Sequence, residues 1–147
     1  MTTSDVSGGV GQTSTPTPLI GIVGPCGAGK TTLADGLKRS GLRARAIAQE
    51  HSYVKDMWQR LTKPGILIFL QASCTVGGQR RNLNWTEPEW EEQQRRLRHA
   101  REHADLYLDT DPLGIVQVLE HTLIFLKNGK EYLKEKQPAG NYPPGLQ

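Results

Sequence analysis

One short glycine-rich segment constrains this chain more than any other part of its sequence. Residues 24–31 (GPCGAGKT) fit the pattern G-x-x-x-x-G-K-[ST], and a second threonine, Thr32, follows directly. Glycines let successive backbone N–H groups turn inward onto phosphate oxygens. A helix that begins near Lys30 adds the positive end of its dipole at the same point. The segment therefore predicts a phosphate-binding loop (P-loop) at the start of a helix.

The side chains of this segment predict a nucleoside triphosphate with Mg²⁺. We expect Lys30 to reach the β- and γ-phosphates and Thr31 to offer its hydroxyl to Mg²⁺. Cys26 lies within the loop, near a helix N-terminus, which can lower the pKa of a thiol. The simpler interpretation is that only the backbone of Cys26 matters, as a spacer in the loop. The residues expected to contact the nucleotide are Gly24, Cys26, Gly27, Ala28, Gly29, Lys30, Thr31 and Thr32.

A Mg²⁺ site usually includes a carboxylate at the end of a neighbouring strand. Glu50 follows the second expected strand and fits best if that strand lies beside the strand before the loop. Asp109 and Asp111, beyond the fourth expected strand, are the alternatives. We expect Asp35 and Asp56, which lie in predicted helices, to be surface charges.

Apolar patterning predicts strands that alternate with helices along the chain. The expected strands are 19–23, 42–49, 66–70 and 106–108, and the expected helices are 31–40, 53–62, 74–81, 88–104 and 112–127. Such alternation is typical of a parallel sheet with helices on both faces. The sequence therefore predicts an α/β fold, a three-layer α/β/α P-loop NTPase with a small sheet of about four strands.

Start signals and apolar stripes support three of these helices. Ser52 can cap 53–62, whose stripe is Val54, Met57, Trp58 and Leu61. Helix 88–104 follows a capping-box sequence, with Thr86 as the cap and Glu89 three residues later. Few of its residues are apolar, which predicts a largely solvated helix or part of a mobile lid. Pro112 opens the last helix, whose stripe is Val116, Leu119, Leu123 and Leu126.

Composition sets the expected boundaries of the domain. Residues 1–17 are mostly Thr, Ser and Gly, and residues 135–147 are rich in Pro and Gly. Neither segment contains enough apolar surface to offset its ordering entropy, so we expect two disordered tails around a domain at 18–134. The sequence shows no membrane span, no signal peptide and, with only Cys26 and Cys74, no cysteine framework. These features favour a cytoplasmic protein.

Arginines follow the third expected strand. Arg80 and Arg81 end the short helix, and Arg95, Arg96 and Arg98 lie in the polar helix that follows. Guanidinium groups suit bidentate phosphate contact, but Glu91 and Glu92 precede Arg95 and Arg96 at helical spacing, and ion pairs explain part of that cluster. We expect residues 80–98 to act as a lid over the bound nucleotide.

The chain resembles the nucleoside and nucleotide kinase group of P-loop proteins, which includes adenylate, thymidylate and shikimate kinases. The resemblance spans about residues 18–127 and includes the loop, the strand Ile66–Leu70 with its following Arg80-Arg81, and the closing segment 104–110. It implies that Arg80 and Arg81 lead into a lid and act in catalysis, and that the turn at Asp111-Pro112 touches the adenine. Family members often have Leu-Asp where this chain has Leu70-Gln71, and the region that holds the acceptor is nearly absent here.

Two functions follow from these residues. The first is an ATP- and Mg²⁺-dependent kinase that transfers the γ-phosphoryl group to a nucleoside, a nucleotide or another small acceptor. The second is a nucleotide-binding or slow ATPase module without an acceptor, which acts as a switch or partner subunit. A GTPase is disfavoured because the chain lacks an Asn-Lys-x-Asp base reader, and specific nucleic-acid binding is disfavoured because no recognisable module is present.

Overall fold

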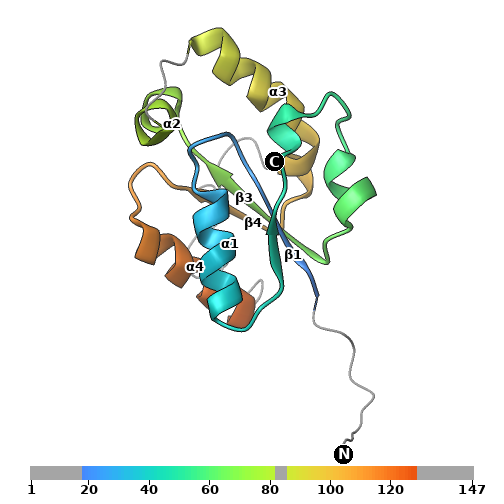
Figure 1. Ribbon diagram of the computed structural model, residues 1–147, viewed down its shortest axis with the longest axis vertical. Coiled ribbons are helices and arrows are strands. Elements are labelled where there is room, and N and C mark those ends of the chain that lie inside the picture. Colours follow the sequence, from blue (N-terminus) through green and yellow to red (C-terminus); the bar gives the residue numbers. More distant parts are fainter. Residues whose placement is uncertain (1–17, 82–85, 129–147) are drawn as a thin grey trace, which may run out of the picture.

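Four parallel strands form the centre of the protein (Figure 1). A computed structural model of the protein describes residues 18–81 and 86–128. The expected tails 1–17 and 135–147, the stretch 82–85 and the boundary at 134 lie outside the described residues. The strands are β1 (Ile20–Val23), β2 (Ala44–Ala46), β3 (Ile66–Gln71) and β4 (Leu106–Asp109), and they lie side by side in the order β2-β1-β3-β4.

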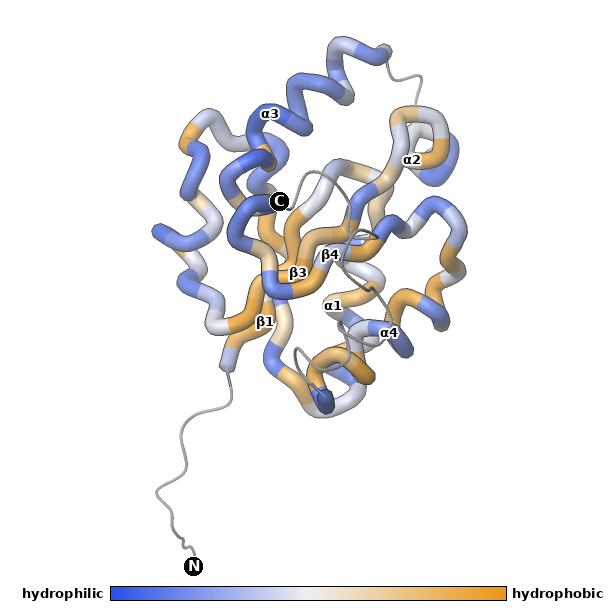
Figure 2. Tube along the Cα trace, turned by 180° about the vertical axis from the view of Figure 1, so that it is seen from behind, coloured by the Kyte–Doolittle hydropathy of each residue, from blue (hydrophilic) through white to orange (hydrophobic). Residues whose placement is uncertain are grey.

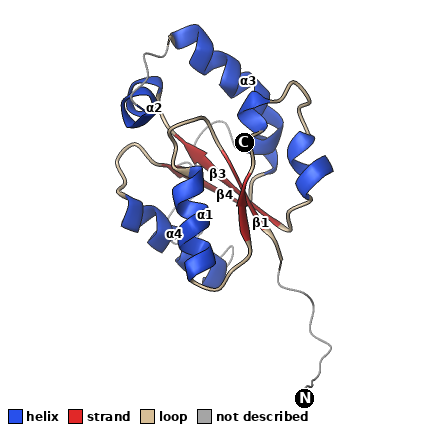
Figure 3. Ribbon diagram, in the orientation of Figure 1, coloured by secondary structure: helices blue, strands red, loops and turns tan. Residues whose placement is uncertain are grey.

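The strands, red in Figure 3, are all parallel, so their carboxyl ends lie at one edge of the sheet. Ile20 of β1 lies opposite Ala44 of β2 and Ile66 of β3, and Ile68 of β3 lies opposite Leu106 of β4. Because all four strands run in the same direction, the loops that follow them gather at that edge. The glycine-rich loop, Glu50 and Thr110 all lie there.

Helices cover both faces of the sheet, as the alternation of strands and helices predicts. On one face, α1 (Lys30–Arg39) and α4 (Ile115–Asn128) pack together over the sheet. On the other face lies α3 (Glu87–His103), together with a 3-10 turn, η1 (Gln49–His51), and a π-helical turn, η2 (Trp58–Thr62). The short helix α2 (Cys74–Arg81) follows β3 at the carboxyl edge.

Alternating side chains divide the interior into two layers. The cluster under α1 and α4 contains Ile20, Ile22, Ile68, Leu70, Leu106 and Leu108, and the cluster under α3 contains Val23, Leu67, Phe69 and Tyr107. The rings of Phe69 and Tyr107 stack with their centroids 5.4 Å apart. Figure 2 shows these strands as the hydrophobic centre of the molecule. Burial of such side chains is the main favourable contribution to folding.

Helix α3 contacts the sheet through two buried residues, and its other residues are exposed or half-buried, as its polar sequence predicted. Figure 2 shows how hydrophilic the helix is overall. Nevertheless Leu97 and Ala100 are fully buried against the sheet. The capping box is confirmed, because the Thr86 hydroxyl accepts a hydrogen bond from the Glu89 N–H and Glu89 accepts one from the Thr86 N–H.

Three sequence expectations differ from the structure. The expected strand 42–49 pairs only over Ala44–Ala46, because β2 turns into η1 soon afterwards. Of the expected helix 53–62, only the second half is helical, as η2 directly after Met57. The Ser52 hydroxyl accepts from the Val54 N–H in a local turn instead of capping a helix. The last helix begins at Ile115 rather than at Pro112, and Val116 of its expected stripe is exposed. Its buried residues are Val118, Thr122 and Phe125.

Within the part of the chain that the structure describes, none of the helices has both the length and the apolar character that a membrane crossing requires.

Candidate functional site

The glycine-rich loop, residues 24–29, joins β1 to α1 at the carboxyl edge of the sheet. Gly27 has a φ of 84°, and a Cβ atom there would lie 2.4 Å from the carbonyl oxygen of Gly77 in α2. A Cβ atom at Gly24 would lie 2.1 Å from the carbonyl oxygen of Leu70. The loop backbone therefore passes so close to β3 and α2 that only glycine fits at these two positions.

The first turn of α1 presents backbone donors without acceptors. The residue before the helix is Gly29, in the left-handed conformation, so no side chain caps the helix, and no acidic residue lies in its first turn. Helical geometry gives the N–H groups of Lys30, Thr31 and Thr32 no partner inside the helix. These groups and the helix dipole make the start of α1 an attractive position for an anion.

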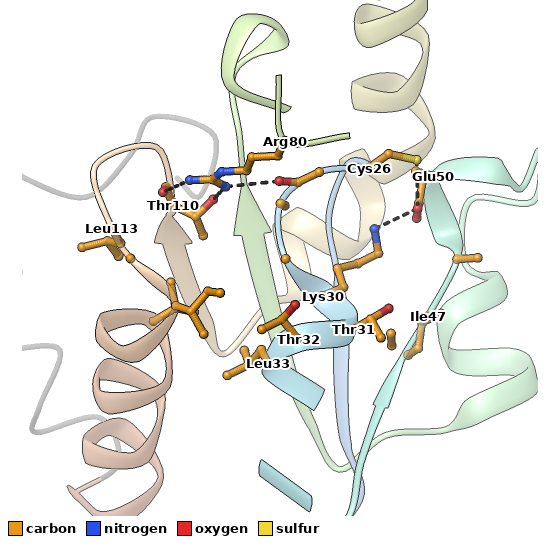
Figure 4. A pocket seen from close by; sticks show the side chains of 18 of the residues that line it. Cys26, Lys30, Thr31, Thr32, Leu33, Ile47, Glu50, Arg80, Thr110 and Leu113 are labelled. Atoms are coloured by element: carbon orange, nitrogen blue, oxygen red, sulfur yellow. Dashed lines mark hydrogen bonds and ion pairs between the residues drawn. The ribbon is translucent and has the colours of Figure 1, made fainter. Parts of the chain in front are cut away.

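Lys30 forms a buried ion pair with Glu50. Its ammonium nitrogen lies 2.8 Å from Oε2 of Glu50, and it also donates to the carbonyl oxygens of Gly24 at 2.8 Å and Pro25 at 3.2 Å. The strand before Glu50, β2, lies beside β1, which is the condition that made Glu50 the preferred carboxylate. Figure 4 shows the ammonium group directed at Glu50 and the Thr31 hydroxyl lying apart from this pair.

Cys26 and His51 complete a cluster around the Glu50 carboxylate. The Sγ atom of Cys26 lies 3.7 Å from Oε2 of Glu50 and 3.4 Å from Nε2 of His51. Nε2 of His51 lies 3.7 Å from the same Oε2. Burial, and then the Glu50 carboxylate, raise the pKa of the Cys26 thiol. The position at a helix start can lower a thiol pKa, but here these two effects outweigh the cation of Lys30.

His51 was not singled out from the sequence. The one clue to its role was its position directly after Glu50, because both residues belong to η1 and lie near the loop. Mg²⁺ prefers oxygen ligands, so expectations for a magnesium site do not point to a histidine.

Arg80 connects α2 to the loop and to the end of β4. Its guanidinium group donates to the carbonyl oxygen of Gly27 at 3.2 Å, to the hydroxyl of Thr110 at 2.9 Å and to the carbonyl oxygen of Thr110 at 2.6 Å. Thr110 is buried, and its hydroxyl donates to the carbonyl oxygen of Gln71. Arg80 is thus held at the site, on the side of the loop away from Glu50 (Figure 4). Arg81 is the last residue of α2, and its side chain lies outside what the structure describes.

A cavity of about 940 Å³ surrounds the start of α1. One side is formed by the end of β2 and η1, and the other by Thr110 and the start of α4. Its lining includes Cys26, Gly27, Ala28, Gly29, Lys30, Thr31, Thr32, Glu50, His51, Arg80, Leu113, Gly114 and Ile115. Gly24 and Pro112 belong to the expected set but do not line the cavity; Pro112 lies in the turn just before its wall.

The remaining charged candidates take part in structural contacts. Asp111 accepts a hydrogen bond from the Ser73 N–H, and Asp109 accepts one from the Asp111 N–H. Asp56 pairs with Arg60, and its pKa is lowered mainly by that hydrogen bond. The surface-charge expectation for Asp35, which lies 3.9 Å from exposed Lys38, agrees with the structure.

Two arginines of α3 form ion pairs with the same glutamate. Arg95 and Arg96 both pair with Glu92, rather than one with each of the two glutamates. Arg96 also donates to the carbonyl oxygen of Glu50 at 3.3 Å, and its guanidinium carbon lies 4.3 Å from the centre of the Tyr53 ring. A second contact from α3 reaches the loop itself, where the Cys26 N–H donates to Oε1 of Gln93 at 3.1 Å.

Comparison with models of known protein families finds no match to this chain, and comparison with curated proteins finds no relative either.

Proposed function

We propose that this chain binds ATP with Mg²⁺ at residues 24–32 and transfers the γ-phosphoryl group to a small acceptor, as a minimal protein of the P-loop nucleoside and nucleotide kinase type. The observation that carries this proposal is the convergence of uncapped helical N–H groups, Lys30 and Arg80 on one cavity. The volume of about 940 Å³ lies within the range of small-molecule sites.

The phosphates would bind at the start of α1. Backbone N–H groups of Lys30, Thr31 and Thr32 offer donors there, and the Lys30 ammonium supplies a positive charge. To reach a phosphate, Lys30 would leave the carboxylate of Glu50. Arg80 lies at the edge of the same cavity, where its guanidinium group would stabilise charge that develops on the transferred phosphoryl group.

The residues at the site fit a Mg²⁺ ion with few protein ligands. The hydroxyl of Thr31, an exposed residue that lines the cavity, is available to the ion. Mg²⁺ keeps several waters and is commonly held by one or two protein groups plus phosphate oxygens. Thr31 would bind the ion directly and Glu50 would bind one of its waters. The ion would neutralise negative charge on the β- and γ-phosphates.

The lining of the cavity extends to both sides of the glycine-rich loop. On the α4 side, Leu113 and Ile115 offer an apolar wall beside Gly114 on which a base can lie. On the β2 side, Ala46 and Ala48 leave room next to His51 for an acceptor. A cavity with space on both sides of the phosphate position favours a kinase over a module that binds the nucleotide alone.

The second candidate, a nucleotide-binding or slow ATPase module without an acceptor, is favoured by one observation. All three donors of the Lys30 ammonium have acceptors within the protein. Because Lys30 already has these acceptors, its contact with a phosphate would add less free energy of binding. Weak binding or slow turnover is consistent with this arrangement.

Calorimetric titration with ATP and Mg²⁺ tests the binding step. We expect Lys30→Ala to abolish measurable binding, while the matched control Lys38→Ala, an exposed lysine of the same helix, binds like the unchanged chain. Circular dichroism checks that both variants fold. Thr31→Ala gives an independent test, because it should remove the dependence of ATP affinity on Mg²⁺. Unchanged affinity in folded Lys30→Ala would rule out this site.

Turnover distinguishes the two candidates. ATP consumption is measured with and without a panel of nucleosides, nucleoside monophosphates and small alcohols. A kinase consumes ATP faster with one acceptor class and forms its phosphorylated product, whereas the module shows the same slow hydrolysis throughout.

A further inference from the structure

We propose that Cys26, Glu50 and His51 form a binding site for a divalent cation of the Zn²⁺ type, at a position separate from the Mg²⁺ of the nucleotide. The three side chains come from the glycine-rich loop and from η1, and they offer a sulfur, an oxygen and a nitrogen donor that lie close together. The inference concerns the protein without nucleotide and does not depend on the kinase activity.

The spacing of the three donor atoms matches one face of a tetrahedral site. Sγ of Cys26, Nε2 of His51 and Oε2 of Glu50 are 3.4, 3.7 and 3.7 Å apart. A triangle with these edges has each corner about 2.1 Å from its centre, close to the Zn–N, Zn–O and Zn–S bond lengths of about 2.0 to 2.3 Å. An ion just above the plane of the triangle reaches all three atoms with little movement of the side chains.

The chemistry of the donors selects the ion. A thiolate and an imidazole suit Zn²⁺, whereas Mg²⁺ takes oxygen ligands. Three protein ligands with the fourth position left open is the arrangement of a zinc ion that can also bind water or a ligand oxygen. All three residues line the cavity, so the fourth position faces the space beside the loop. On binding, the thiol proton of Cys26 passes to solvent and His51 coordinates through its neutral ring.

A second observation concerns the other oxygen of the Glu50 carboxylate. Oε1 of Glu50 is buried and accepts no hydrogen bond from the residues that the structure describes. A buried carboxylate oxygen without a donor is costly. A divalent cation on Oε2 would reduce the negative charge of the whole carboxylate, and therefore the charge on Oε1. Lys30, which the ion would displace from Oε2, keeps the carbonyl oxygens of Gly24 and Pro25.

The same three residue types also occur in cysteine nucleophile triads, but their arrangement here differs. In a triad the carboxylate holds one ring nitrogen of the histidine and the nucleophile uses the other. In this protein both Sγ of Cys26 and Oε2 of Glu50 approach Nε2 of His51. Three atoms around one point favour a shared cation over a proton relay.

Metal titration of the full chain without an affinity tag tests the site. With Co²⁺ as a spectroscopic probe, we expect thiolate-to-metal charge-transfer absorption at one ion per chain. With Zn²⁺ in calorimetry, Cys26→Ala and His51→Ala should each weaken binding by about 100-fold or more. The matched controls Cys74→Ala and His103→Ala should bind Zn²⁺ like the unchanged chain. Lys30→Met should bind Zn²⁺ more tightly, because its competitor for Glu50 is gone.

A protection experiment needs no variant. Zn²⁺ should slow the alkylation of Cys26 by iodoacetamide, followed by mass spectrometry, while Cys74 in the same sample reacts as before. Equal alkylation of Cys26 with and without saturating Zn²⁺, or the absence of thiolate absorption with Co²⁺, would overturn the proposal. Neither result bears on ATP binding, so failure of this site is distinguishable from failure of the proposed function.

Discussion

Lys30 and Glu50 form an ion pair at 2.8 Å with side chains that are only 11% and 4% exposed. An ammonium group held this way has a strong partner before any phosphate arrives. A phosphate at the start of α1 must therefore compete with the carboxylate, and a Lys30 that moves to a phosphate leaves Glu50 without its cation. The pair thus links ligand binding at the loop to the state of Glu50, 20 residues further along the chain.

The first prediction concerns the stability of this pair. Lys30→Ala leaves a buried carboxylate without a cation, and we expect it to lower the free energy of unfolding by about 3–5 kcal/mol. The double variant Lys30→Ala/Glu50→Gln should recover part of that loss, because the buried charge is gone. Exposed Lys38→Ala serves as the control and should change stability by less than about 0.5 kcal/mol. Urea unfolding measures all three, and equal midpoints for the two single lysine variants would contradict the prediction.

The second prediction concerns Arg80. Arg80→Ala removes its hydrogen bonds to Gly27 and Thr110 together with a cation at the cavity edge. If the chain turns over ATP, we expect turnover to fall by at least about tenfold, or about 1.4 kcal/mol in the barrier, and more than ATP affinity falls. Arg80→Lys should recover little, since an ammonium group cannot form the forked contact. Arg98→Ala, an exposed arginine of α3, is the matched control, and a similar loss in both variants would refute a specific role for Arg80.

The third prediction concerns the docking of α3. Leu97 is fully buried between α3 and the sheet, whereas Leu61 in η2 is 77% exposed. Leu97→Ala should lower the free energy of unfolding by about 2–5 kcal/mol, because it leaves a cavity in the core. The same substitution at Leu61 should change it by less than about 0.5 kcal/mol. Denaturant unfolding followed by circular dichroism compares the two variants. Equal stability of the two would mean that the contact of Leu97 with the sheet contributes little to folding.

The extent to which the sequence predicts this structure depends on how local each signal is. The apolar runs of β1 and β3, the capping box of α3 and the glycines of the loop are local, and the elements they predict are present. Only the second half of the helix expected at 53–62 forms, because Gln49 binds the backbone of this segment. This buried side chain accepts from the Trp58 N–H at 2.8 Å and donates to the carbonyl oxygen of Val54 at 2.9 Å, so the chain wraps around Gln49 instead of forming a regular helix.

The sequence singled out residues that lie near one another in the structure, but not all of their contacts. The pattern at 24–31 picked out the loop and Lys30, and the position after a strand picked out Glu50, which lies beside Lys30. The cluster of Cys26 with His51 required the spatial contact between the loop and η1, which no spacing in the sequence encodes. The two contacts of α3 with the site, from Gln93 to Cys26 and from Arg96 to Glu50, likewise join residues 67 and 46 positions apart.

The fourth prediction concerns pH. His99 accepts a hydrogen bond from the Trp58 indole N–H at 3.1 Å through Nδ1, so its ring is neutral there. Burial lowers the pKa of His99, and the neighbouring charges of His103 and Lys55 lower it further, against smaller opposing effects of Asp56 and Glu102. A folded-state pKa below the unfolded value means that the unfolded chain binds the proton first. Stability from this contact is therefore present above about pH 6.5 and is lost as the pH falls from there toward the folded pKa.

Unfolding in urea at pH 8 and pH 5, followed by tryptophan fluorescence, measures this loss. His99→Gln keeps an acceptor for the indole N–H but does not titrate, so the drop in stability between the two pH values should be smaller in that variant. An unchanged drop would assign the pH dependence to other groups.

The contact between Gly27 and Gly77 has a mechanical consequence. A Cβ atom on Gly27 would lie within 3 Å of the carbonyl oxygen, Cα and carbonyl carbon of Gly77, and one on Gly77 would lie 3.0 Å from the carbonyl oxygen of Cys26. The loop and α2 therefore touch backbone to backbone, with no side chain between them that could change rotamer and absorb a shift. A displacement of α2 therefore requires the loop backbone to move with it, so the position of this short helix constrains the conformation of the loop.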